Sequence, residues 1–360
     1  MQVLLNTEPL QNANSTRGVG TYTRELLQSL RELADLPEPL VVHATHELAE
    51  FGTQVTKDAD GIDVIHYPFF DLFFSTLPAR SKTPVVVTVH DVIPLVFPEE
   101  YKPGLKGQWR FQGQKKRLQG VDAIITDSEA SRADIIEHLD ISSHKVHVVP
   151  LAAGQSLQPV SDYYAQKYTE ELKLPAKYIL YVGDINYNKN LPTLLLALTQ
   201  IPEDIHLCVV SQTFRNTTIP EGQQLAEIIK ANDLESRVHV LDIPKGDDEK
   251  LAAVISKARC LIQPSLYEGF GLPVLEALQV GTVVVSADTS SLPEVVGDAA
   301  ILVDPTITGL ADGIQQAVAL RGTDRQDMIE RGFMRANMFS WSKTARATYD
   351  IYRQVVQENQ

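Results

Sequence analysis

The amino-acid sequence predicts an α/β protein with two doubly wound domains, and three observations support this fold class. Short apolar runs alternate with helical patterns along almost the whole chain, as they do in a parallel sheet covered by helices. The alternation stops at a polar stretch after Leu151 and then starts again. At 360 residues, the chain also exceeds what one hydrophobic core usually holds.

The first half contains six predicted strands, because runs of Val, Ile and Leu end at polar or turn-forming residues. Helices are predicted between them where Leu and Ile recur every three or four residues. The strands are expected at 2–6, 39–45, 63–68, 83–91, 122–128 and 145–151, and helices at 21–33 and 130–139.

The second half repeats this pattern. Strands are expected at 178–184, 206–211, 238–242, 260–265, 283–288 and 300–304, and helices at 191–201, 223–233, 249–258 and 273–279. We therefore expect one domain at 1–160, a second at 161–338 and a C-terminal segment at 339–360. Open α/β sheets bind ligands at the carboxyl ends of their strands, so the site is expected in a cleft between the domains.

Composition excludes several classes of function. The net charge of −14 provides no basic field for a nucleic-acid backbone. Cys208 and Cys260 lie in apolar runs and are expected to be reduced core residues, as in a reducing compartment. The first residues turn polar too soon for a signal peptide, and no run approaches the length of a membrane span. We expect a cytoplasmic protein.

The segment SLYEGFGLPVLEALQVG, residues 265–281, contains the strongest motif. A helix is predicted to start near Leu272, with the glycine-rich turn at 269–271 before it. Unpaired amides and the helix dipole favour an anion such as phosphate at this position. Glu268 in the loop and Glu276 in the helix would both face one ligand. The alternative is that both are ordinary loop and surface acids, with the glycines serving only the turn.

Three further segments carry candidate site residues, each with a structural alternative. Gly18 and Gly20 follow the first strand and precede a helix, in a G-x-G-x-x-T pattern that does not fit a dinucleotide site. In YVGDINYNKNL, the turn leaves a strand at Gly183, and Lys189 is placed to reach a diphosphate or is a surface lysine. His90 and Asp91 follow a strand and are either a substrate pair or a local hydrogen bond.

No metal site is predicted. Asp58-Ala59-Asp60 has the D-x-D form that metal-dependent sugar transferases use, but it lies in a polar segment before a turn glycine and a strand. The sequence also lacks a zinc pattern, a phosphate-binding loop of the Walker type and a nucleophile elbow.

Together these motifs resemble those of family 4 glycosyltransferases, which have the two-domain GT-B fold. The resemblance spans nearly the whole chain, in the family's order, through GVGTYTREL, DVIHYPFFD, VTVHDVIPLVFPEEY, DAIITDSEASR, YVGDINYNKNL, PSLYEGFGLPVLEAL and SSLPEVVGDAAILVDP. It implies a retaining, nucleotide-sugar-dependent enzyme marked by two glutamates with seven residues between them. It also implies that the C-terminal helix crosses back to the first domain.

The resemblance assigns roles to the site residues. Glu268 would lie beside the donor sugar and Glu276 would bind the nucleotide ribose. The sugar hydroxyls and the diphosphate would be bound by the backbone amides of Gly269, Phe270, Gly271 and Leu272. Members often carry an arginine immediately before the lysine of the phosphate turn, where this chain has Asn188. Arg17, beside the glycine loop, is the candidate that replaces it.

The predicted activity is transfer of a hexose from a nucleoside diphosphate sugar to an acceptor hydroxyl, with retention at the anomeric carbon. Lys189, the amides of Gly18 and Gly20, and the helix N-terminus near Leu272 would stabilise the leaving diphosphate, so no metal is required. His90 would position the sugar or acceptor. By resemblance the preferred donor is GDP-mannose. The alternatives are a GT-B phosphorylase, a nucleotide-sugar epimerase or a non-catalytic nucleotide-sugar-binding subunit.

One stretch points to the acceptor. Residues 102–120 contain six basic residues and no acid, with aromatic residues between them. They form either a solvated helix face or a surface that meets an anionic acceptor or an anionic membrane. A glycan or lipid-linked acceptor at the inner face of the plasma membrane fits the second interpretation.

Overall fold

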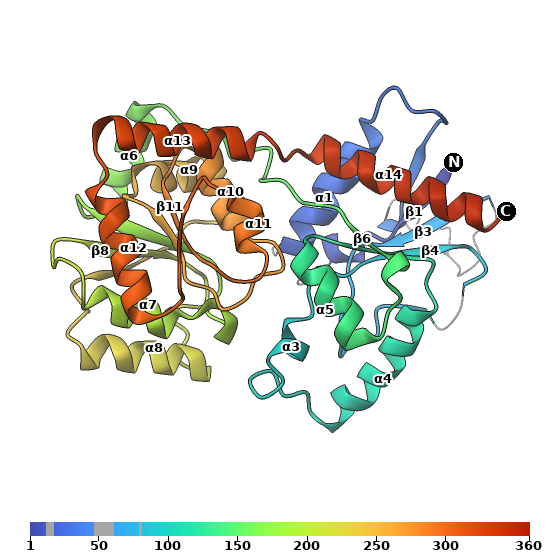
Figure 1. The fold of residues 1–360 in the computed structure, drawn as a ribbon, viewed down its shortest axis with the longest axis horizontal. Coiled ribbons are helices and arrows are strands. Elements are labelled where there is room, and N and C mark those ends of the chain that lie inside the picture. Colours follow the sequence, from blue (N-terminus) through green and yellow to red (C-terminus); the bar gives the residue numbers. More distant parts are fainter. Residues whose placement is uncertain (12–17, 47–60, 79–80) are drawn as a thin grey trace. The chain divides into compact units, whose positions relative to one another are not determined.

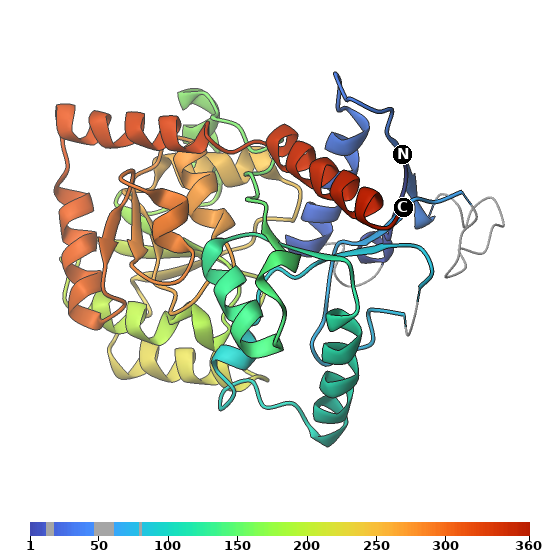
Figure 2. The same ribbon diagram turned by 45° about the vertical axis from the view of Figure 1, so that its right-hand side comes forward.

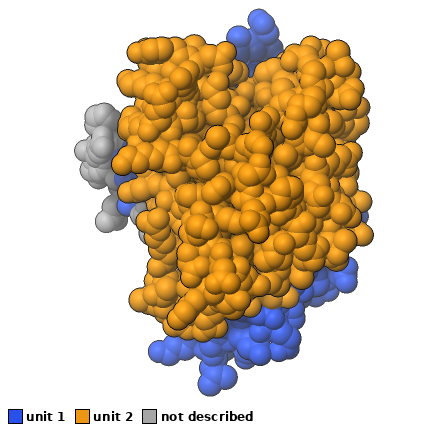
Figure 3. All heavy atoms as spheres, turned by 90° about the vertical axis from the view of Figure 1, so that its left-hand side faces the viewer, with its two compact units in different colours: residues 1–152, 339–360 blue, residues 153–338 orange. Residues whose placement is uncertain are grey.

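The computed structural model describes residues 1–11, 18–46, 61–78 and 81–360. The chain forms two compact units, coloured separately in Figure 3. Unit 1 contains Met1–Ala152 and Phe339–Gln360, and unit 2 contains Ala153–Met338. Within the described residues, no helix is both long enough and apolar enough to cross a membrane.

Unit 1 is built on a parallel sheet whose described strands have the order β2-β1-β3-β4-β5-β6. Its strands are β1 (Gln2–Leu5), β2 (Val41–Ala44), β3 (Val64–Tyr67), β4 (Val85–Thr88), β5 (Ala123–Thr126) and β6 (Val146–Val148). Its helices are η1 (Glu8–Leu10), α1 (Gly18–Arg31), α3 (Ile93–Val96), α4 (Leu105–Gln119), α5 (Glu129–Leu139), η2 (Ser143–Lys145) and α14 (Trp341–Glu358).

The two faces of this sheet have different cores. Val85 and Val87 of β4 pack with Leu118 of α4 and Ile135 of α5, so α4 and α5 cover one face. Helices α1 and α14 lie against each other on the other face, as Figures 1 and 2 show. The alternation of side chains along each strand produces this division.

A buried polar chain links α14 to the sheet of unit 1. The Tyr352 hydroxyl lies 2.6 Å from Nδ1 of His66, and Nε2 of His66 lies 2.8 Å from the Thr88 hydroxyl. The Thr88 hydroxyl in turn lies 2.9 Å from that of Tyr22 in α1. Burial, with the nearby charge of His90, lowers the pKa of His66 to about 3, so its ring is neutral in this network.

Unit 2 also has a parallel sheet, and the order of its described strands is β12-β11-β10-β7-β8-β9. The strands are β7 (Tyr178–Val182), β8 (His206–Val210), β9 (Val238–Leu241), β10 (Leu261–Gln263), β11 (Val284–Ala287) and β12 (Ile301–Val303). The helices are α6 (Asp162–Glu171), η3 (Tyr187–Lys189), α7 (Leu191–Leu198), α8 (Pro220–Ala231), α9 (Asp248–Lys257), α10 (Leu272–Gln279), α11 (Leu292–Val296), α12 (Ile307–Ala319) and α13 (Gly322–Ala336).

The strand order of unit 2 fixes where a ligand site is expected. Strands β7 and β10 are neighbours, paired at Leu180 and Leu261, although two other strands separate them in sequence. The chain proceeds outward from β7 in one direction and from β10 in the other, which makes this pair the topological switch point of the sheet. The turns after these two strands therefore form the expected binding edge.

The predicted α/β class and the predicted strands are confirmed in both units. The segment 153–160, which the sequence predicts as the end of the first domain, groups with unit 2. The side-chain amide of Gln279 in α10 donates to the carbonyls of Gly154 and Leu157, which attaches this segment to the second sheet's helices. Helix α14 packs on α1 within unit 1.

Candidate active site

The turns after β7 and β10 bring Lys189 and Glu268 together, although 79 residues separate them. The Lys189 ammonium lies 2.8 Å from Oε1 and 2.7 Å from Oε2 of Glu268. The Glu268 side chain is 8% exposed and that of Lys189 is 20% exposed. The sequence predicts both residues at the site, and the structure shows that they form an ion pair.

Two further side chains donate to the Glu268 carboxylate. The Gln263 amide and the Ser265 hydroxyl each lie 2.7 Å from Oε1. Gln263 ends β10, and Ser265 lies two residues further on, so the end of the strand itself supplies these donors. The carboxylate thus has three donor side chains and one fixed orientation, and charge-assisted hydrogen bonds of this kind are the strong ones.

The backbone of the Glu268 loop is held from two sides. The Asn188 amide is buried and donates to the carbonyl of Tyr267 at 2.9 Å, and the Leu266 amide donates to the carbonyl of Asn188 at 2.8 Å. From the other side, the Ser291 hydroxyl donates to the carbonyls of Glu268 and Phe270, each at 2.9 Å. Asn188, predicted from its place beside Lys189 as part of the phosphate turn, therefore positions the Glu268 loop through its side chain.

Helix α10 begins at Leu272, as the sequence predicts. Gly271 precedes it with φ of +105°, and a Cβ there would lie 2.7 Å from a methyl group of Leu292. Both the backbone angle and the close approach require glycine at this position. Gly269 and Phe270 complete the turn between Glu268 and the helix, so the predicted turn and helix start are both present.

Glu276 has different surroundings from Glu268. Its side chain is partly buried in α10, and within the described part of the chain its carboxylate has neither a hydrogen bond nor an ion pair. Burial, together with the negative charge of Asp248 at the start of α9, raises the pKa of Glu276 to about 7. A partly buried carboxylate with a raised pKa and no donor is a candidate for binding hydroxyl groups of a ligand.

Gly183 directly follows β7, and a side chain at this position would clash with its surroundings. Its φ is +151°, and a Cβ would lie 2.8 Å from the hydroxyl oxygen of Tyr181. That hydroxyl donates to the carbonyl of Asp184 at 2.6 Å, so it is fixed in place. Gly183 therefore allows the chain to turn toward Lys189 past a buried tyrosine.

In unit 1, His90 follows β4 and pairs with Asp127, which follows β5. Nδ1 of His90 lies 2.7 Å from a carboxylate oxygen of Asp127, and the rings of His90 and Tyr22 form a T-shaped pair with 4.7 Å between their centres. Burial lowers the pKa of His90, but the charge and hydrogen bond of Asp127 outweigh burial and raise it above the usual value.

The sequence leaves open whether His90 and Asp91 are a substrate pair or form a local hydrogen bond, and the structure gives each of them a hydrogen bond to another residue. A carboxylate oxygen of Asp91 accepts a hydrogen bond from the backbone amide of Ile93 at 3.0 Å, at the start of α3. The partner of His90 is Asp127, which the sequence analysis missed. The signal was present, because Asp127 lies at the carboxyl end of a predicted strand, and β4 and β5 are neighbours in the sheet.

The glycine loop of unit 1 lies at the start of α1. Gly18 is the first residue of the helix and Gly20 is buried in its first turn. Arg17 lies outside the described residues, as do Asp58 and Asp60. Their predicted roles, in diphosphate binding and in a loop without a metal, stay predictions.

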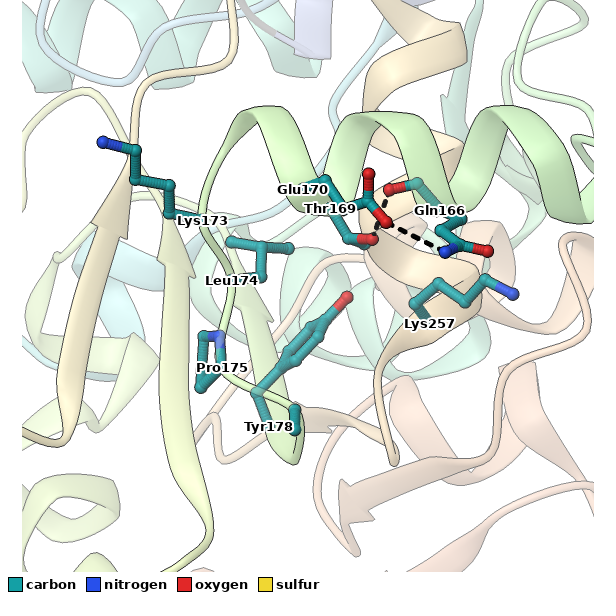
Figure 4. A pocket seen from close by; sticks show the side chains of 9 residues that line it. Gln166, Thr169, Glu170, Lys173, Leu174, Pro175, Tyr178 and Lys257 are labelled. Carbon is teal, nitrogen blue, oxygen red and sulfur yellow. Dashed lines mark hydrogen bonds between the residues drawn. The ribbon is translucent and has the colours of Figure 1, made fainter.

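A separate hollow of about 350 Å³ opens at the opposite end of β7 (Figure 4). It is lined by Tyr178, the first residue of β7, with side chains of α6 and of Lys173 and Lys257 around it. Because ligands of such sheets bind at the carboxyl ends of the strands, this position does not favour it as the active site.

Comparison with known proteins agrees with this geometry. The sequence model of the family described as "Glycosyl transferases group 1" matches residues 165–335, and that of "Glycosyltransferase Family 4" matches residues 46–152. The chain belongs to glycosyltransferase family 4. The first match contains the Lys189 turn and the Glu268 loop, and the second contains the His90 segment.

Individual relatives support the same assignment. This family 4 glycosyltransferase is 29% identical to the O-antigen chain mannosyltransferase B of Escherichia coli, over 98% of this chain and 100% of the relative. Among solved structures, it is similar to sucrose-phosphate synthase from Thermosynechococcus elongatus, with a TM-score of 0.74, 20% identity and coverage of 99% and 100%. It is also similar to HepE of Anabaena in complex with UDP-glucose, with a TM-score of 0.73, 16% identity and coverage of 98% and 100%. The two parallel sheets are those of the GT-B fold.

Proposed function

We propose that this family 4 glycosyltransferase transfers a hexose, specifically mannose from GDP-mannose, to a glycan or lipid-linked acceptor, with retention at the anomeric carbon. The observation that carries the proposal is the Lys189–Glu268 pair at the switch point of unit 2. Eight residues after Glu268, Glu276 adds a carboxylate without a donor in the described part of the chain. The turn before α10 is suited to an anion such as a diphosphate, because it leads into a helix N-terminus. Glu268 and Glu276 beside it are suited to the hydroxyl groups of a sugar and a ribose.

The proposed reaction exchanges one bond of the anomeric carbon for another and develops two opposite charges. The bond between the anomeric carbon and the diphosphate oxygen breaks, and the acceptor oxygen bonds to the same carbon from the same face. The acceptor hydroxyl gives its proton to the departing diphosphate. Positive charge develops on the sugar and negative charge on the diphosphate, so preorganised groups of both signs stabilise the transition state.

Lys189 and Glu268 are suited to these two charges. Lys189 would stabilise the leaving diphosphate, together with the amides at the start of α10. Glu268 would stabilise the sugar, and its three donors fix it in place beforehand. Glu276 would accept hydrogen bonds from the ribose hydroxyls. His90, fixed by Asp127, is proposed to position the sugar or the acceptor.

The choice of mannose is supported by the relative from Escherichia coli, whose name is that of a mannosyltransferase. The use of a nucleotide sugar is supported by HepE, which was solved with UDP-glucose. These names describe the relatives. For this chain, they select the donors to test first.

A thermal-shift panel tests the donor proposal. We expect GDP-mannose to raise the melting temperature more than GDP-glucose, UDP-glucose, UDP-N-acetylglucosamine or ADP-glucose, since a ligand at about 100 times its Kd stabilises by about 2.7 kcal/mol. Release of GDP from GDP-mannose should continue in excess EDTA, because Lys189 and backbone amides replace a cation. A larger shift with another nucleotide sugar would contradict the choice of GDP-mannose, and activity that requires added Mn²⁺ would contradict metal independence.

A further inference from the structure

Helix α4 of unit 1 has one buried face and one exposed face. Leu118 and Gln114 are buried against the rest of the unit, and Phe111 packs beside them. The Gln114 amide donates to the carbonyl of Phe74 at 2.6 Å and to the Thr76 hydroxyl at 2.7 Å. These contacts account for the face that holds α4 to unit 1.

The opposite face of α4 carries large apolar side chains in contact with water. Leu105 is 87% exposed and Trp109 is 80% exposed, and the two are four residues apart on one side of the helix. Phe74, in the segment that α4 packs on, is 62% exposed, and the Arg110 guanidinium lies 5.9 Å from its ring centre. Figures 1 and 2 both show α4 at the outer margin of unit 1.

The structure divides the six basic residues of 102–120 into two sets. Lys115 pairs with Asp140 at 2.5 Å, Arg117 donates to the Leu77 carbonyl at 2.8 Å, and Lys102 pairs with Glu99 at 2.9 Å. These three have structural partners. The other three, Lys106, Arg110 and Lys116, are exposed, and none of them has an ion pair within the described residues.

The exposed apolar and basic side chains share one face of the helix. At about 100° per residue, Leu105, Trp109, Lys116, Lys106 and Arg110 fall within an arc of about 140°, and the buried residues occupy the other side. We define these five side chains and Phe74 as the α4 surface.

We propose that the α4 surface docks on an anionic lipid bilayer, with its apolar side chains among the acyl chains near the headgroups and its basic side chains on the lipid phosphates. This combination of a basic polar fringe with exposed Trp, Leu and Phe is the chemistry of interfacial helices. The attraction is local to the α4 surface, because the chain as a whole has a net charge of −14 and would be repelled by the same bilayer. The proposal does not depend on the identity of the sugar donor.

Co-sedimentation with vesicles tests the proposal. The full chain is mixed with vesicles of phosphatidylcholine alone or with vesicles in which half of the lipid is phosphatidylglycerol, at low and at high salt. We expect binding to the anionic vesicles at low salt, and weaker binding at high salt, because the Debye length shortens.

Two sets of variants distinguish binding through the α4 surface from an effect of the net charge of the chain. The triple variant Lys106→Ala, Arg110→Ala, Lys116→Ala should bind about 100-fold more weakly, which corresponds to about 1 kcal/mol per basic side chain. The matched control, Lys167→Ala, Lys173→Ala, Lys230→Ala, makes the same change in net charge with exposed lysines of unit 2 and should bind like the wild type. Replacing Leu105 and Trp109 with glutamine should also weaken binding while leaving the melting temperature within a few degrees.

Tryptophan fluorescence gives an independent readout. The chain has two tryptophans, and Trp341 is 3% exposed, so a change in emission on adding vesicles reports on Trp109. We expect a shift to shorter wavelength with anionic vesicles and none with phosphatidylcholine alone. Absence of the wild type from the pellet at every composition would overturn the proposal. So would equal binding by the two triple variants, or binding to an anionic polysaccharide without binding to vesicles.

Discussion

The loop that carries Glu268 and the helix that carries Glu276 are adjacent in sequence, but their carboxylates have opposite surroundings. Glu268 accepts hydrogen bonds from Lys189, Gln263 and Ser265. Glu276 accepts none within the described residues, and its own burial and the charge of Asp248 raise its pKa to about 7. We interpret the first as a group fixed before the donor arrives, and the second as a group that gains its hydrogen bonds from the donor.

The largest effect on the free energy of unfolding is expected from removing Lys189, the counter-charge of Glu268. The Lys189→Met variant leaves the buried Glu268 carboxylate without its counter-charge, and we expect it to lower the free energy of unfolding by about 3 kcal/mol. Urea unfolding followed by circular dichroism measures this change. The control is Lys177→Met, which breaks an ion pair with Asp204 that is exposed on both sides and should cost less than about 1 kcal/mol. Equal losses in the two variants would show that the Lys189–Glu268 pair is not a fixed element of the site.

Removing the second carboxylate should affect binding of the donor more than its turnover. We expect Glu276→Ala to raise KM for the donor about 10- to 100-fold with little change in kcat, because the ribose hydroxyls lose a charged acceptor. Steady-state release of the nucleoside diphosphate gives both constants. Glu249→Ala, an exposed acid in the first turn of α9, is the control. A variant with unchanged KM and reduced kcat would assign Glu276 to the chemical step and remove the difference between the two glutamates.

The raised pKa of Glu276 predicts a smaller effect on stability that depends on pH. A carboxyl group whose pKa is higher in the folded protein contributes stability that is complete below its unfolded value and is lost as the pH rises through about 7. The Glu276→Gln variant has no such group. Relative to the wild type, it should therefore gain on the order of 1–2 kcal/mol between about pH 5 and pH 8.

Denaturant unfolding of the Glu276→Gln variant and the wild type at a series of pH values tests this expectation. If the two stability curves run parallel across that range, Glu276 is ionised in the folded protein at neutral pH. The contrast with Glu268 would then rest on hydrogen bonds alone.

The sequence predicts the fold and the start of α10 because both depend on local patterns. Apolar runs mark the strands, and a glycine-rich turn before Leu272 marks the helix start. The order of the strands in the sheet is not a local property. The switch point between β7 and β10, which explains why Lys189 and Glu268 meet, becomes visible only when the sheet is assembled.

The hydrogen-bond partners of the site residues also depend on contacts between separate segments, which local sequence patterns do not predict. Asp127 lies 37 residues after His90, whereas the acid that stands beside His90 in the sequence is Asp91. The donors Gln263 and Ser265 lie close to Glu268 in sequence, but whether their side chains point toward the Glu268 carboxylate depends on how the chain turns after β10. Asn188 is recognised as the site of a missing arginine, whereas its contact with the Tyr267 carbonyl requires two loops to be placed together.

The catalytic role of Glu268 is tested most directly by the steady-state turnover of the preferred nucleotide sugar by the wild type and by Glu268→Gln, with nucleotide binding measured on the same samples. We expect the wild type to release the nucleoside diphosphate. We expect Glu268→Gln to lower kcat about 10²- to 10³-fold while the Kd for the nucleotide stays within a few fold. Full turnover by Glu268→Gln would contradict the role of Glu268. A wild type that binds the nucleotide sugar and releases nothing, even with acceptor glycans present, would contradict the assignment as a transferase and leave a nucleotide-sugar-binding protein.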